Sequence, residues 1–358
     1  MKSDTIRTLD LFAGAGGFSA GLHSASDRFV TVRAVELDVA AAASYRANFG
    51  DVVYTGGIEN WLDEEDVPQV DLVVGGPPCQ GFSPLGKRAE DDHRNFLWEK
   101  YAETVRRARP TYFLLENVPA FLRSPQFDVF SEALLDGGML DEYEVEAFVL
   151  NSAHYGAAQI RKRVVVIGRR RGLPPVGAPS ETHATDYVPL SKVWTGVPAE
   201  LTQSELPDYV VRHEKKMLPG PFRSDELHLA RTYSSTSLLR FAAIPEGGNR
   251  FDLPEELKAP CWRKHTSGSG DVMGRLTWTK PSVTIRTEFF KPEKGRYLHP
   301  TEHRAITHFE AARIQGFPDD YNFVGSKSAI AKQIGNAVPI PLGAALGRHL
   351  LTAIDRER

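Results

Sequence analysis

The sequence predicts an α/β fold, with a doubly wound, mostly parallel sheet and a second, smaller, irregular domain. Segments with strand and helix patterns alternate as far as residue 170, which is typical of repeated βαβ units. This alternation stops near Gly172-Leu173-Pro174-Pro175, and residues 179–274 are short mixed segments rich in Pro, Gly and Ser. We therefore expect a first domain over 1–178, a second region over 179–327, and a segment, 328–358, that returns to the first domain.

Short apolar runs bounded by turn residues predict the strands of the sheet. The expected strands are Thr8–Phe12, Thr31–Val35, Asp51–Tyr54, Val70–Val74, Thr111–Leu115, Tyr143–Leu150 and Val164–Ile167. The sequence does not decide whether the last two of these strands pair antiparallel. Helices are expected from Ala20 onward and over Ala40–Phe49, Phe96–Arg109, Phe309–Gly316 and Pro339–Ile354. Regular structure is also expected at 275–278 and 282–285.

The composition excludes several classes of protein. The chain is 41% hydrophobic and 25% charged, which suits a globular protein with a sizeable core. No apolar run approaches the roughly 20 residues that span a membrane. The net charge of −3 is not that of a strongly basic nucleic-acid binder. Two cysteines, Cys79 and Cys261, form neither a disulfide framework nor a zinc signature, so we expect a cytoplasmic protein without a metal.

One stretch stands out, Gly75-Gly76-Pro77-Pro78-Cys79-Gln80-Gly81-Phe82-Ser83. It follows a buried-strand pattern, and its glycines and prolines predict a turn. A thiol there would lie at the carboxyl end of a parallel strand, where α/β proteins place their sites. The alternative is a structural cysteine that acts as a small apolar side chain.

The segment Ala13–Ser19 is a glycine-rich turn between the first strand and a helix, which suits a nucleotide-type ligand because the backbone can approach it closely. Its spacing is not the dinucleotide pattern G-x-G-x-x-G. Glu36 ends the second strand about 20 residues later, where a carboxylate can accept from ribose hydroxyls. Tight packing of the turn and a surface Glu36 are the alternatives.

Two further features lie at strand ends or beside them. Glu116 follows the fifth strand, where it is either functional or the cap of a helix. The polar segment 84–95 is long for a loop and lies beside the candidate nucleophile, so it is interpreted as a lid.

Taken in order, five motifs carry a resemblance to a known family. They are Asp10–Gly17, Pro77-Pro78-Cys79-Gln80, Glu116-Asn117-Val118, Gln159-x-Arg161-x-Arg163 and Gln333–Pro339. The chain resembles the cytosine-C5 DNA methyltransferases, except mainly over residues 180–265. The resemblance implies a class I, Rossmann-like methyltransferase fold, with residues 180–274 as a target-recognition domain.

The resemblance also implies roles for individual residues. Cys79 would be the nucleophile, Glu116 the acid at the cytosine ring, and Arg161 and Arg163 would orient the base and the carboxylate. The residues implied at the S-adenosylmethionine site are Phe12, Ala13, Gly14, Gly17, Phe18, Glu36, Leu37, Ile58, Pro78, Asn336 and Val338. Gln80, Ser83, Lys87 and Arg94 would contact DNA from the lid region, and Ser267, Gly268, Ser269 and Gly270 would contact it from the second domain.

The chain departs from the family pattern at Gly57. Family members usually carry an acidic residue just before the position of Ile58, where it contacts the adenine amine. Here the segment is Thr55-Gly56-Gly57-Ile58, so the adenine contact is left without its usual residue.

The expected chemistry requires a base flipped out of the duplex, because cytosine is not accessible inside the stack. A thiolate that adds to C6 makes C5 nucleophilic and divides a difficult reaction into easier steps. The alternatives are an RNA cytosine-C5 methyltransferase, a catalytically silent DNA-binding homologue and, disfavoured by the glycine spacing, a dinucleotide-dependent oxidoreductase. Double-stranded DNA is the expected partner of a bacterial monomer, with a paired restriction endonuclease as a further possibility.

Overall fold

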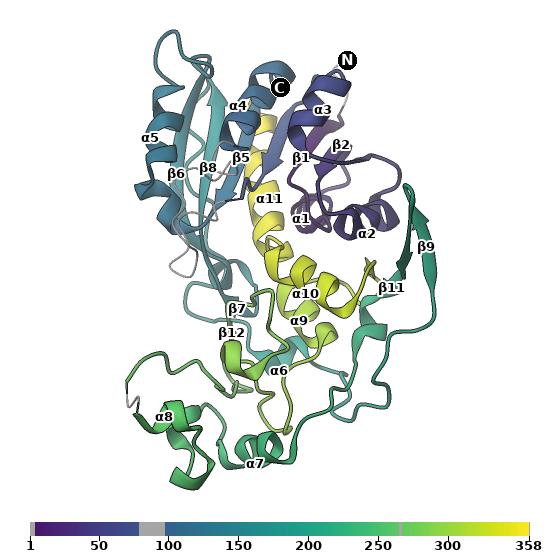
Figure 1. The fold of residues 1–358 in the computed structure, drawn as a ribbon. Helices are drawn as coiled ribbons and strands as arrows, with labels where there is room; N and C mark the ends of the chain where they lie inside the picture. Colours follow the sequence, from purple (N-terminus) through teal and green to yellow (C-terminus); the bar gives the residue numbers. More distant parts are fainter. Residues whose placement is uncertain (1–3, 79–96, 265–266, 358) are drawn as a thin grey trace. The chain divides into compact units, whose positions relative to one another are not determined.

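The computed structural model describes residues 4–78, 97–264 and 267–357, which divide into two compact units (Figure 1). Unit 1 comprises Met1–Tyr155, Lys162–Thr182 and Val338–Arg358, and unit 2 comprises Gly156–Arg161 and His183–Ala337.

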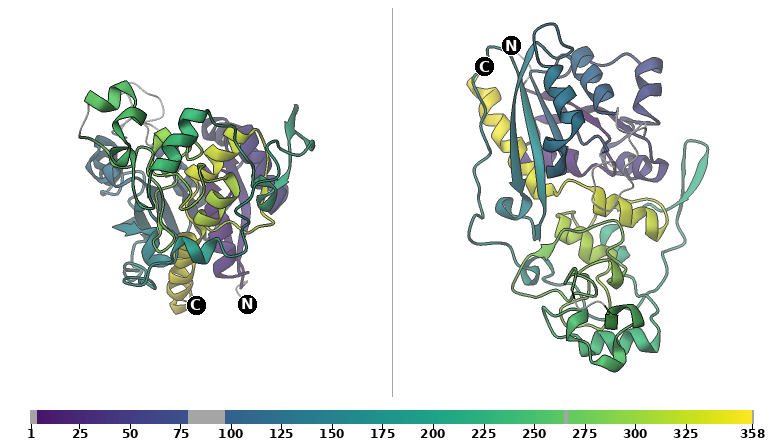
Figure 2. Two further views of the ribbon diagram at one scale, coloured as in Figure 1. Left: turned by 90° about the horizontal axis from the view of Figure 1, so that it is seen from below. Right: turned by 60° about the vertical axis from the view of Figure 1, so that its left-hand side comes forward.

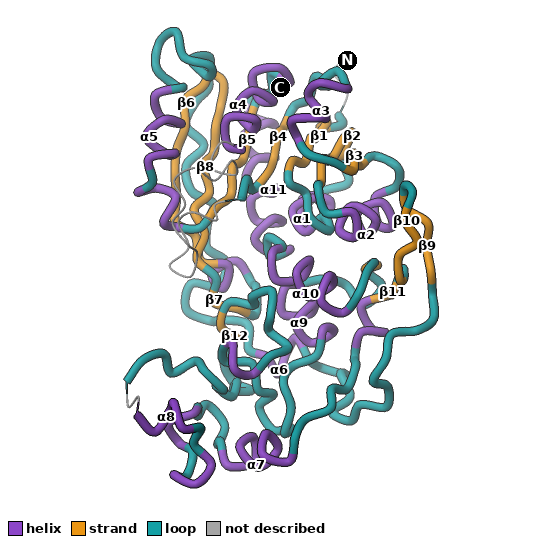
Figure 3. Tube along the Cα trace, viewed as in Figure 1, coloured by secondary structure: helices purple, strands orange, loops and turns teal. Residues whose placement is uncertain are grey.

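Unit 1 is built on a seven-stranded sheet with the order β3-β2-β1-β4-β5-β8-β6 (Figure 3). Only β8 runs antiparallel to its neighbours, β5 and β6, so the predicted mostly parallel sheet is confirmed. The strands are β1 (Ile6–Leu11), β2 (Phe29–Glu36), β3 (Val53–Thr55), β4 (Leu72–Gly75), β5 (Tyr112–Asn117), β6 (Tyr143–Asn151) and β8 (Lys162–Arg170). One prediction was wrong in detail: β5 continues to Asn117, so Glu116 lies within the strand rather than after it.

Helices cover both faces of this sheet, as a doubly wound fold requires. One face carries α1 (Gly17–Ala25), α2 (Val39–Phe49) and α11 (Ile340–Arg356), and the other carries α3 (Ile58–Glu64), α4 (Leu97–Ala108) and α5 (Pro125–Glu132). Successive strand residues enter opposite cores because side chains alternate along a strand. In β5, Phe113 and Leu115 pack with α3, α4 and α5, whereas Leu114 packs with α1 and α11.

Two glycines allow α11, the yellow helix that leads to the C-terminus in Figure 2, to cross α1 at close range. A Cβ atom on Gly21 would lie 2.7 Å from the Cα atom of Gly343, so a side chain there would force the helices apart. The apolar run Lys327–Arg356 is long enough for a membrane span by length and composition alone. Its helices are separate, however, because α10 (Lys327–Asn336) ends before Pro339 and α11 starts at Ile340.

Unit 2 consists of short elements around a small apolar core of Phe241, Ile244, Leu253, Met273 and Leu298. The predicted helix Phe309–Gly316 is observed as α9 (His308–Gln315), with Thr307 in a capping box and Gly316 in the left-handed region at φ 88°. The sequence did not indicate the hairpin of β9 (Val210–His213) and β10 (Lys216–Pro219), or α7 (Ser235–Ala243).

The expected regular segments 275–278 and 282–285 are only partly present. Ser282–Val283 forms β12, which pairs with β7 (Gln159–Ile160). Arg275 makes a single bridge to Leu298 instead of a strand. Its buried guanidinium group donates to the carbonyl oxygens of Ile244 and His299, so the side chain organises the surrounding loops.

Candidate active site

The strand order changes direction between β1 and β4, which is where open α/β sheets bind their ligands. The last residues of neighbouring strands lie opposite one another at this edge. Leu11 of β1 pairs with Val35 of β2 and with Gly75 of β4, and Gly75 pairs with Leu115 of β5. The glycine turn, Glu36, the Gly76–Pro78 turn and Glu116 therefore start from adjacent positions along one edge of the sheet.

The glycine turn after β1 uses backbone conformations that most residues avoid. Phe12, Gly14 and Gly16 have φ angles of 55°, 56° and 91°. A Cβ atom on Gly14 would meet no heavy atom within 4 Å, so the space above this residue is open. Glycine at position 14 is explained by its φ angle, and the result is an open cradle that a ligand can approach closely.

Both oxygens of Glu36 are held by backbone N–H groups. Gly14 donates to Oε2 at 2.8 Å and Asp38 donates to Oε1 at 2.7 Å. Burial raises the pKa of this carboxyl, while these two hydrogen bonds act in the opposite direction. The carboxylate thus connects the glycine turn to the start of α2, in the position that the sequence analysis assigned to a ribose-binding acid.

The other predicted cofactor residues differ in burial. Phe18 and Ile58 are buried in the two main cores, and Ala13 and Gly17 are also buried. Leu37 is exposed, as is Pro78, whereas Val338 packs partly buried against the core beneath α1 and α11. Asn336 is exposed at the end of α10 in unit 2.

The turn that leads to Cys79 is held in place by Asn117, a residue to which the sequence analysis gave no role. Asn117 is buried, its Nδ2 donates to the carbonyl oxygen of Pro77 at 3.0 Å, and its Oδ1 accepts from the N–H of Val118 at 2.8 Å. Its place in the Glu116-Asn117-Val118 motif was the signal from which the sequence could have given Asn117 a role. Cys79, Gln80, Ser83, Lys87 and Arg94 lie outside the described residues.

Glu116 and Arg163 form an ion pair at the carboxyl end of β5. Nε of Arg163 lies 2.8 Å from Oε1 of Glu116, and the two side chains are only 15% and 12% exposed. A Cβ atom on Gly76 would lie 3.0 Å from Oε2 of Glu116, so the glycine leaves room for this carboxylate. A carboxylate that is largely withdrawn from solvent and fixed by a guanidinium partner can accept a hydrogen bond from a ligand at a defined point.

Arg161 was predicted to act with Arg163, but the two belong to different units. Arg161 lies in unit 2, where it is buried and its Nη1 donates to the carbonyl oxygen of Ile285 at 2.9 Å. Only Lys162, at which unit 1 resumes, lies between the two arginines in the sequence.

The predicted DNA-contacting loop Ser267–Gly270 lies in unit 2, and Ser267, Gly268 and Ser269 are exposed. Two arginines hold it by its backbone. Nη2 of Arg250 donates to the carbonyl of Ser267 at 3.1 Å, and Nη2 of Arg296 donates to that of Gly270 at 2.9 Å.

A buried polar network lies under the glycine turn. The hydroxyl of Ser19 donates to Oδ2 of Asp10 at 2.6 Å and lies 2.7 Å from the hydroxyl of Tyr45. Burial raises the pKa of Asp10 to about 7, the charge of Glu36 adds to this shift, and the Ser19 hydrogen bond opposes it. The sequence analysis placed Asp10 in the first strand and in the Asp10–Gly17 motif but gave its side chain no role.

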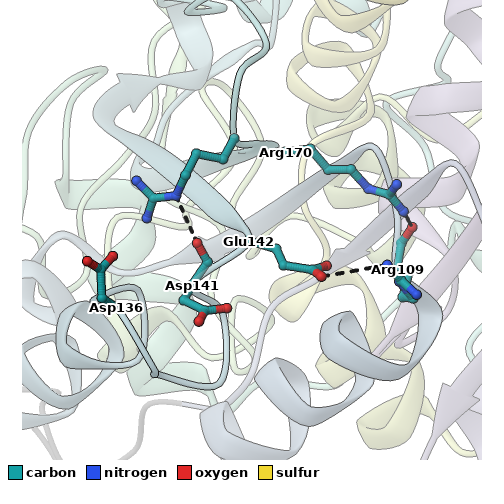
Figure 4. Close-up of a pocket in the computed structure, with 6 residues that line it drawn as sticks. Arg109, Asp136, Asp141, Glu142 and Arg170 are labelled. Atoms are coloured by element: carbon teal, nitrogen blue, oxygen red, sulfur yellow. Dashed lines mark hydrogen bonds and ion pairs between the residues drawn. The ribbon is translucent and has the colours of Figure 1, made fainter.

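An open pocket of about 570 Å³ lies elsewhere in unit 1 (Figure 4). It is lined by Arg109, Asp136, Asp141, Glu142, Arg170 and Arg171. Arg169 pairs with Tyr112, the first residue of β5, so this region is at the opposite end of the strand from Glu116. Arg109 pairs with Glu142 at 3.6 Å, and Arg171 donates to the backbone of Asp141 at 2.8 Å, so its charges are largely satisfied within the protein. We do not assign the active site to it.

Comparison with known proteins shows which family the chain resembles. Residues 6–352 match the family model described as C-5 cytosine-specific DNA methylase. The type II methyltransferase M1.HphI of Haemophilus parahaemolyticus is 33% identical over 364 residues, which cover 99% of this chain and 88% of that protein. The type II methyltransferase M.DdeI of Desulfomicrobium norvegicum is 32% identical, over 96% of this chain and 88% of that protein.

Solved structures show the same fold. A prophage-encoded protein of E. coli, described as a DNA modification methyltransferase, superposes with a TM-score of 0.72 at 24% identity, over 98% of this chain and all of that one. The Dnmt2 methyltransferase of S. pombe superposes with a TM-score of 0.64 at 15% identity, over 99% of both chains. These likenesses support the class I, Rossmann-like fold.

Proposed function

The chain belongs to the C-5 cytosine-specific DNA methylases, and on that premise we propose that it methylates cytosine at C5 in duplex DNA with S-adenosylmethionine as the methyl donor. The observation that carries the proposal is the Glu116–Arg163 ion pair, at the same sheet edge as the turn that leads to Cys79.

The residues at the sheet edge fit an adenosyl cofactor. The space above Gly14 is open, and the carboxylate of Glu36 lies at the adjoining strand end, where it can accept from ribose hydroxyls. Phe12, Ala13, Gly17, Phe18, Leu37, Ile58, Pro78, Asn336 and Val338 complete or support the proposed site. When bound, S-adenosylmethionine supplies an electrophilic methyl group.

The chain's residues then act on the flipped base. The Cys79 thiolate adds to C6, which places negative charge on the ring and makes C5 nucleophilic. Glu116 holds a proton near N3 as this charge develops, and Arg163 fixes the position of the carboxylate. After methylation, loss of the C5 proton allows the bond between Cys79 and C6 to break, so the thiolate is regenerated. Arg161 is proposed to orient the base.

Unit 2 is proposed to recognise the target sequence, with Ser267, Gly268, Ser269 and Gly270 at the base edges. Gln80, Ser83, Lys87 and Arg94 are proposed to contact DNA beside the flipped cytosine. The relatives are named type II methyltransferases, which supports a bacterial modification enzyme. We further propose that it is paired with a restriction endonuclease and acts without a metal as a cytoplasmic, nucleoid-associated monomer.

Methyl transfer from labelled S-adenosylmethionine tests the activity. Duplex DNA should accept the label and transfer RNA should not. Labelling of transfer RNA alone would support the RNA methyltransferase alternative, and labelling of neither would support the silent homologue.

A mechanism-based trap tests the nucleophile. Fluorine at C5 cannot leave as a proton does, so DNA with 5-fluorocytosine at the target should form a protein adduct that survives denaturation and requires S-adenosylmethionine. The adduct should be absent from Cys79→Ala and present in Cys261→Ala, the matched control at an exposed thiol. An adduct that maps to Cys261 would overturn the assignment.

A further inference from the structure

Two buried glutamines from distant parts of the sequence meet inside unit 2. Gln159 lies in β7 and Gln315 is the last residue of α9, and both side chains are fully buried. Nε2 of Gln159 donates to Oε1 of Gln315 at 2.6 Å. Buried amides need partners for their donors and for their acceptors. The other end of each amide therefore shows which parts of the backbone the pair connects.

Backbone groups at the two ends fix the direction of both amides. Oε1 of Gln159 accepts from the N–H of Ile285 at 3.2 Å, and an N–H group requires an acceptor. Nε2 of Gln315 donates to the carbonyl oxygen of Ile334 at 2.5 Å, and a carbonyl requires a donor. With both ends fixed, a donor of Gln159 faces an acceptor of Gln315. The two side chains thus form one hydrogen-bond chain, which loss of either amide interrupts.

One end of this chain holds the segment that carries Arg161. The N–H of Ile285 donates to Gln159, and the carbonyl oxygen of Ile285 accepts from Nη1 of Arg161 at 2.9 Å. Parallel pairing of β7 with β12 brings the two segments together, since Ser282 pairs with Gln159. The Arg161 guanidinium group is therefore fixed to the same residue, Ile285, as the glutamine chain.

The other end of the chain holds the end of α10, where Asn336 lies. The carbonyl of Ile334 is among the last four of this helix, which have no partner within the helix itself, and Gln315 supplies one. The same helix end is packed closely on the segment after β12. A Cβ atom on Gly335 would lie 2.5 Å from the carbonyl carbon of Arg286, so the two backbones are in direct contact.

We propose that Gln159 and Gln315 are positioning residues that connect Arg161 to Asn336, so that binding of the base and binding of the cofactor favour each other. The inference rests on the proposed function, which places the flipped cytosine at Arg161 and S-adenosylmethionine at Asn336. Both contacts belong to unit 2, and a continuous chain of buried hydrogen bonds can couple them. Such coupling is reciprocal, so it can be measured from the cofactor side.

Calorimetry with S-adenosylhomocysteine tests the proposal, using the protein alone and the protein bound to a duplex that carries the target found by bisulfite sequencing. Wild type should bind S-adenosylhomocysteine about tenfold more tightly when the duplex is bound, within the usual range for coupled sites. Gln315→Met keeps the length of the side chain and removes the amide. It should reduce this coupling factor to about twofold or less.

Gln333→Met is the matched control. Gln333 is also buried, and its Nε2 donates from α10 to the carbonyl oxygen of Val324 at 2.8 Å, outside the glutamine chain. Its loss should lower the melting temperature about as much as Gln315→Met does, since each variant loses a buried amide. The wild-type coupling factor should remain. A coupling factor reduced equally in both variants would indicate general loosening of α10 and would contradict the proposal.

Gln159→Met interrupts the same chain and leaves the contact of Gln315 with α10 in place, so it decides the question if Gln315→Met does not fold. The double variant Gln159→Met/Gln315→Met should lose no more coupling than either single variant, because one chain is interrupted in all three.

Retention of the wild-type coupling factor in Gln159→Met or Gln315→Met would overturn the proposal. Wild-type protein that methylates duplex DNA but shows no coupling would also overturn it, and the proposed function would stand. Wild-type protein that neither binds S-adenosylhomocysteine nor methylates DNA would remove the proposed function, and this inference with it.

Discussion

Among single residues, Glu116 is the one whose surroundings best explain a chemical role. Its carboxylate is largely withdrawn from solvent, is paired with Arg163 at 2.8 Å, and is accommodated by the missing side chain of Gly76. Glu116 and Arg163 lie on strands whose register places both side chains on one face, since Glu116 pairs with Val165 in β8 and residues two apart share a face.

Glu116→Gln should lower the single-turnover rate of methyl transfer by about 10²- to 10⁴-fold, the range for loss of a positioned acid. Folding should be retained, because glutamine keeps the size and one acceptor. Glu144→Gln is the matched control, since Glu144 also pairs with an arginine of β8, Arg169, at 2.6 Å but at the far end of the strand. Equal rates for Glu116→Gln and wild type would contradict the role.

Asp10 gives a pH-dependent prediction. The pKa of Asp10 in the folded protein, about 7, exceeds its ordinary value of 3.8. Between these two pH values, the folded state holds a proton that the unfolded state has released. The resulting contribution to the free energy of unfolding is fully present below about pH 4 and is lost as the pH rises through 7. Asp10→Asn should remove this dependence.

The melting temperature of Asp10→Asn minus that of wild type should therefore be higher at pH 8 than at pH 5.5. This change should correspond to a few kcal/mol at most in the free energy of unfolding. Ser19→Ala provides a second measurement, because it removes the hydrogen bond that opposes the pKa shift. Parallel melting profiles for Asp10→Asn and wild type across this range would show that Asp10 does not titrate there.

At the scale of elements, the loop Ser267–Gly270 is held in position by arginine side chains that donate to its backbone carbonyls. Arg296 donates to the carbonyl of Gly270 and also, through Nη1, to those of Gly247 and Gly248 at 2.8 and 3.0 Å. It thus ties two loops together, while Arg250 holds the other end of the candidate loop. Gly268, at φ 109°, tolerates a conformation that other residues rarely adopt.

Arg296→Lys should loosen this loop because lysine cannot donate to several carbonyls in a planar arrangement. The KM for DNA should rise about fivefold with kcat nearly unchanged, as expected for a loss of about 1 kcal/mol of hydrogen bonding. Arg240→Lys is the control, since Nε of Arg240 likewise donates to a backbone carbonyl, that of Leu257 at 2.7 Å, which is not part of the 267–270 loop. A fall in kcat with constant KM would contradict a positioning role in DNA binding.

At the scale of the whole molecule, the chain passes between its two units several times. Unit 1 holds Glu36, Glu116 and Arg163, and unit 2 holds the Ser267–Gly270 loop. Separate units can carry chemistry and sequence recognition independently, which predicts that recognition can be exchanged.

Replacing residues 179–274 by the equivalent region of a relative should move the methylated sequence and preserve methyl transfer. Bisulfite sequencing of DNA treated with the exchanged protein reads out the site. A matched exchange that reinserts this chain's own 265–270 should return part of the original preference if that loop reads base edges. Methylation of the original site after the full exchange would assign recognition elsewhere.

The sequence by itself determined the features that depend on local pattern. Apolar runs and turn residues predicted the seven strands of the mostly parallel sheet, and the helix expected over Phe309–Gly316 is observed as α9. The candidate residues at strand ends, such as Glu36 and Cys79, also followed from local patterns, because the carboxyl ends of parallel strands meet at one edge.

Only the tertiary structure decided which of these residues meet. The Glu116–Arg163 ion pair depends on the antiparallel register of β5 and β8, which no local pattern specifies. Unit 2 was unpredictable in detail because its loops are held by side chains such as Arg275 and Arg296, whose carbonyl partners are distant in sequence.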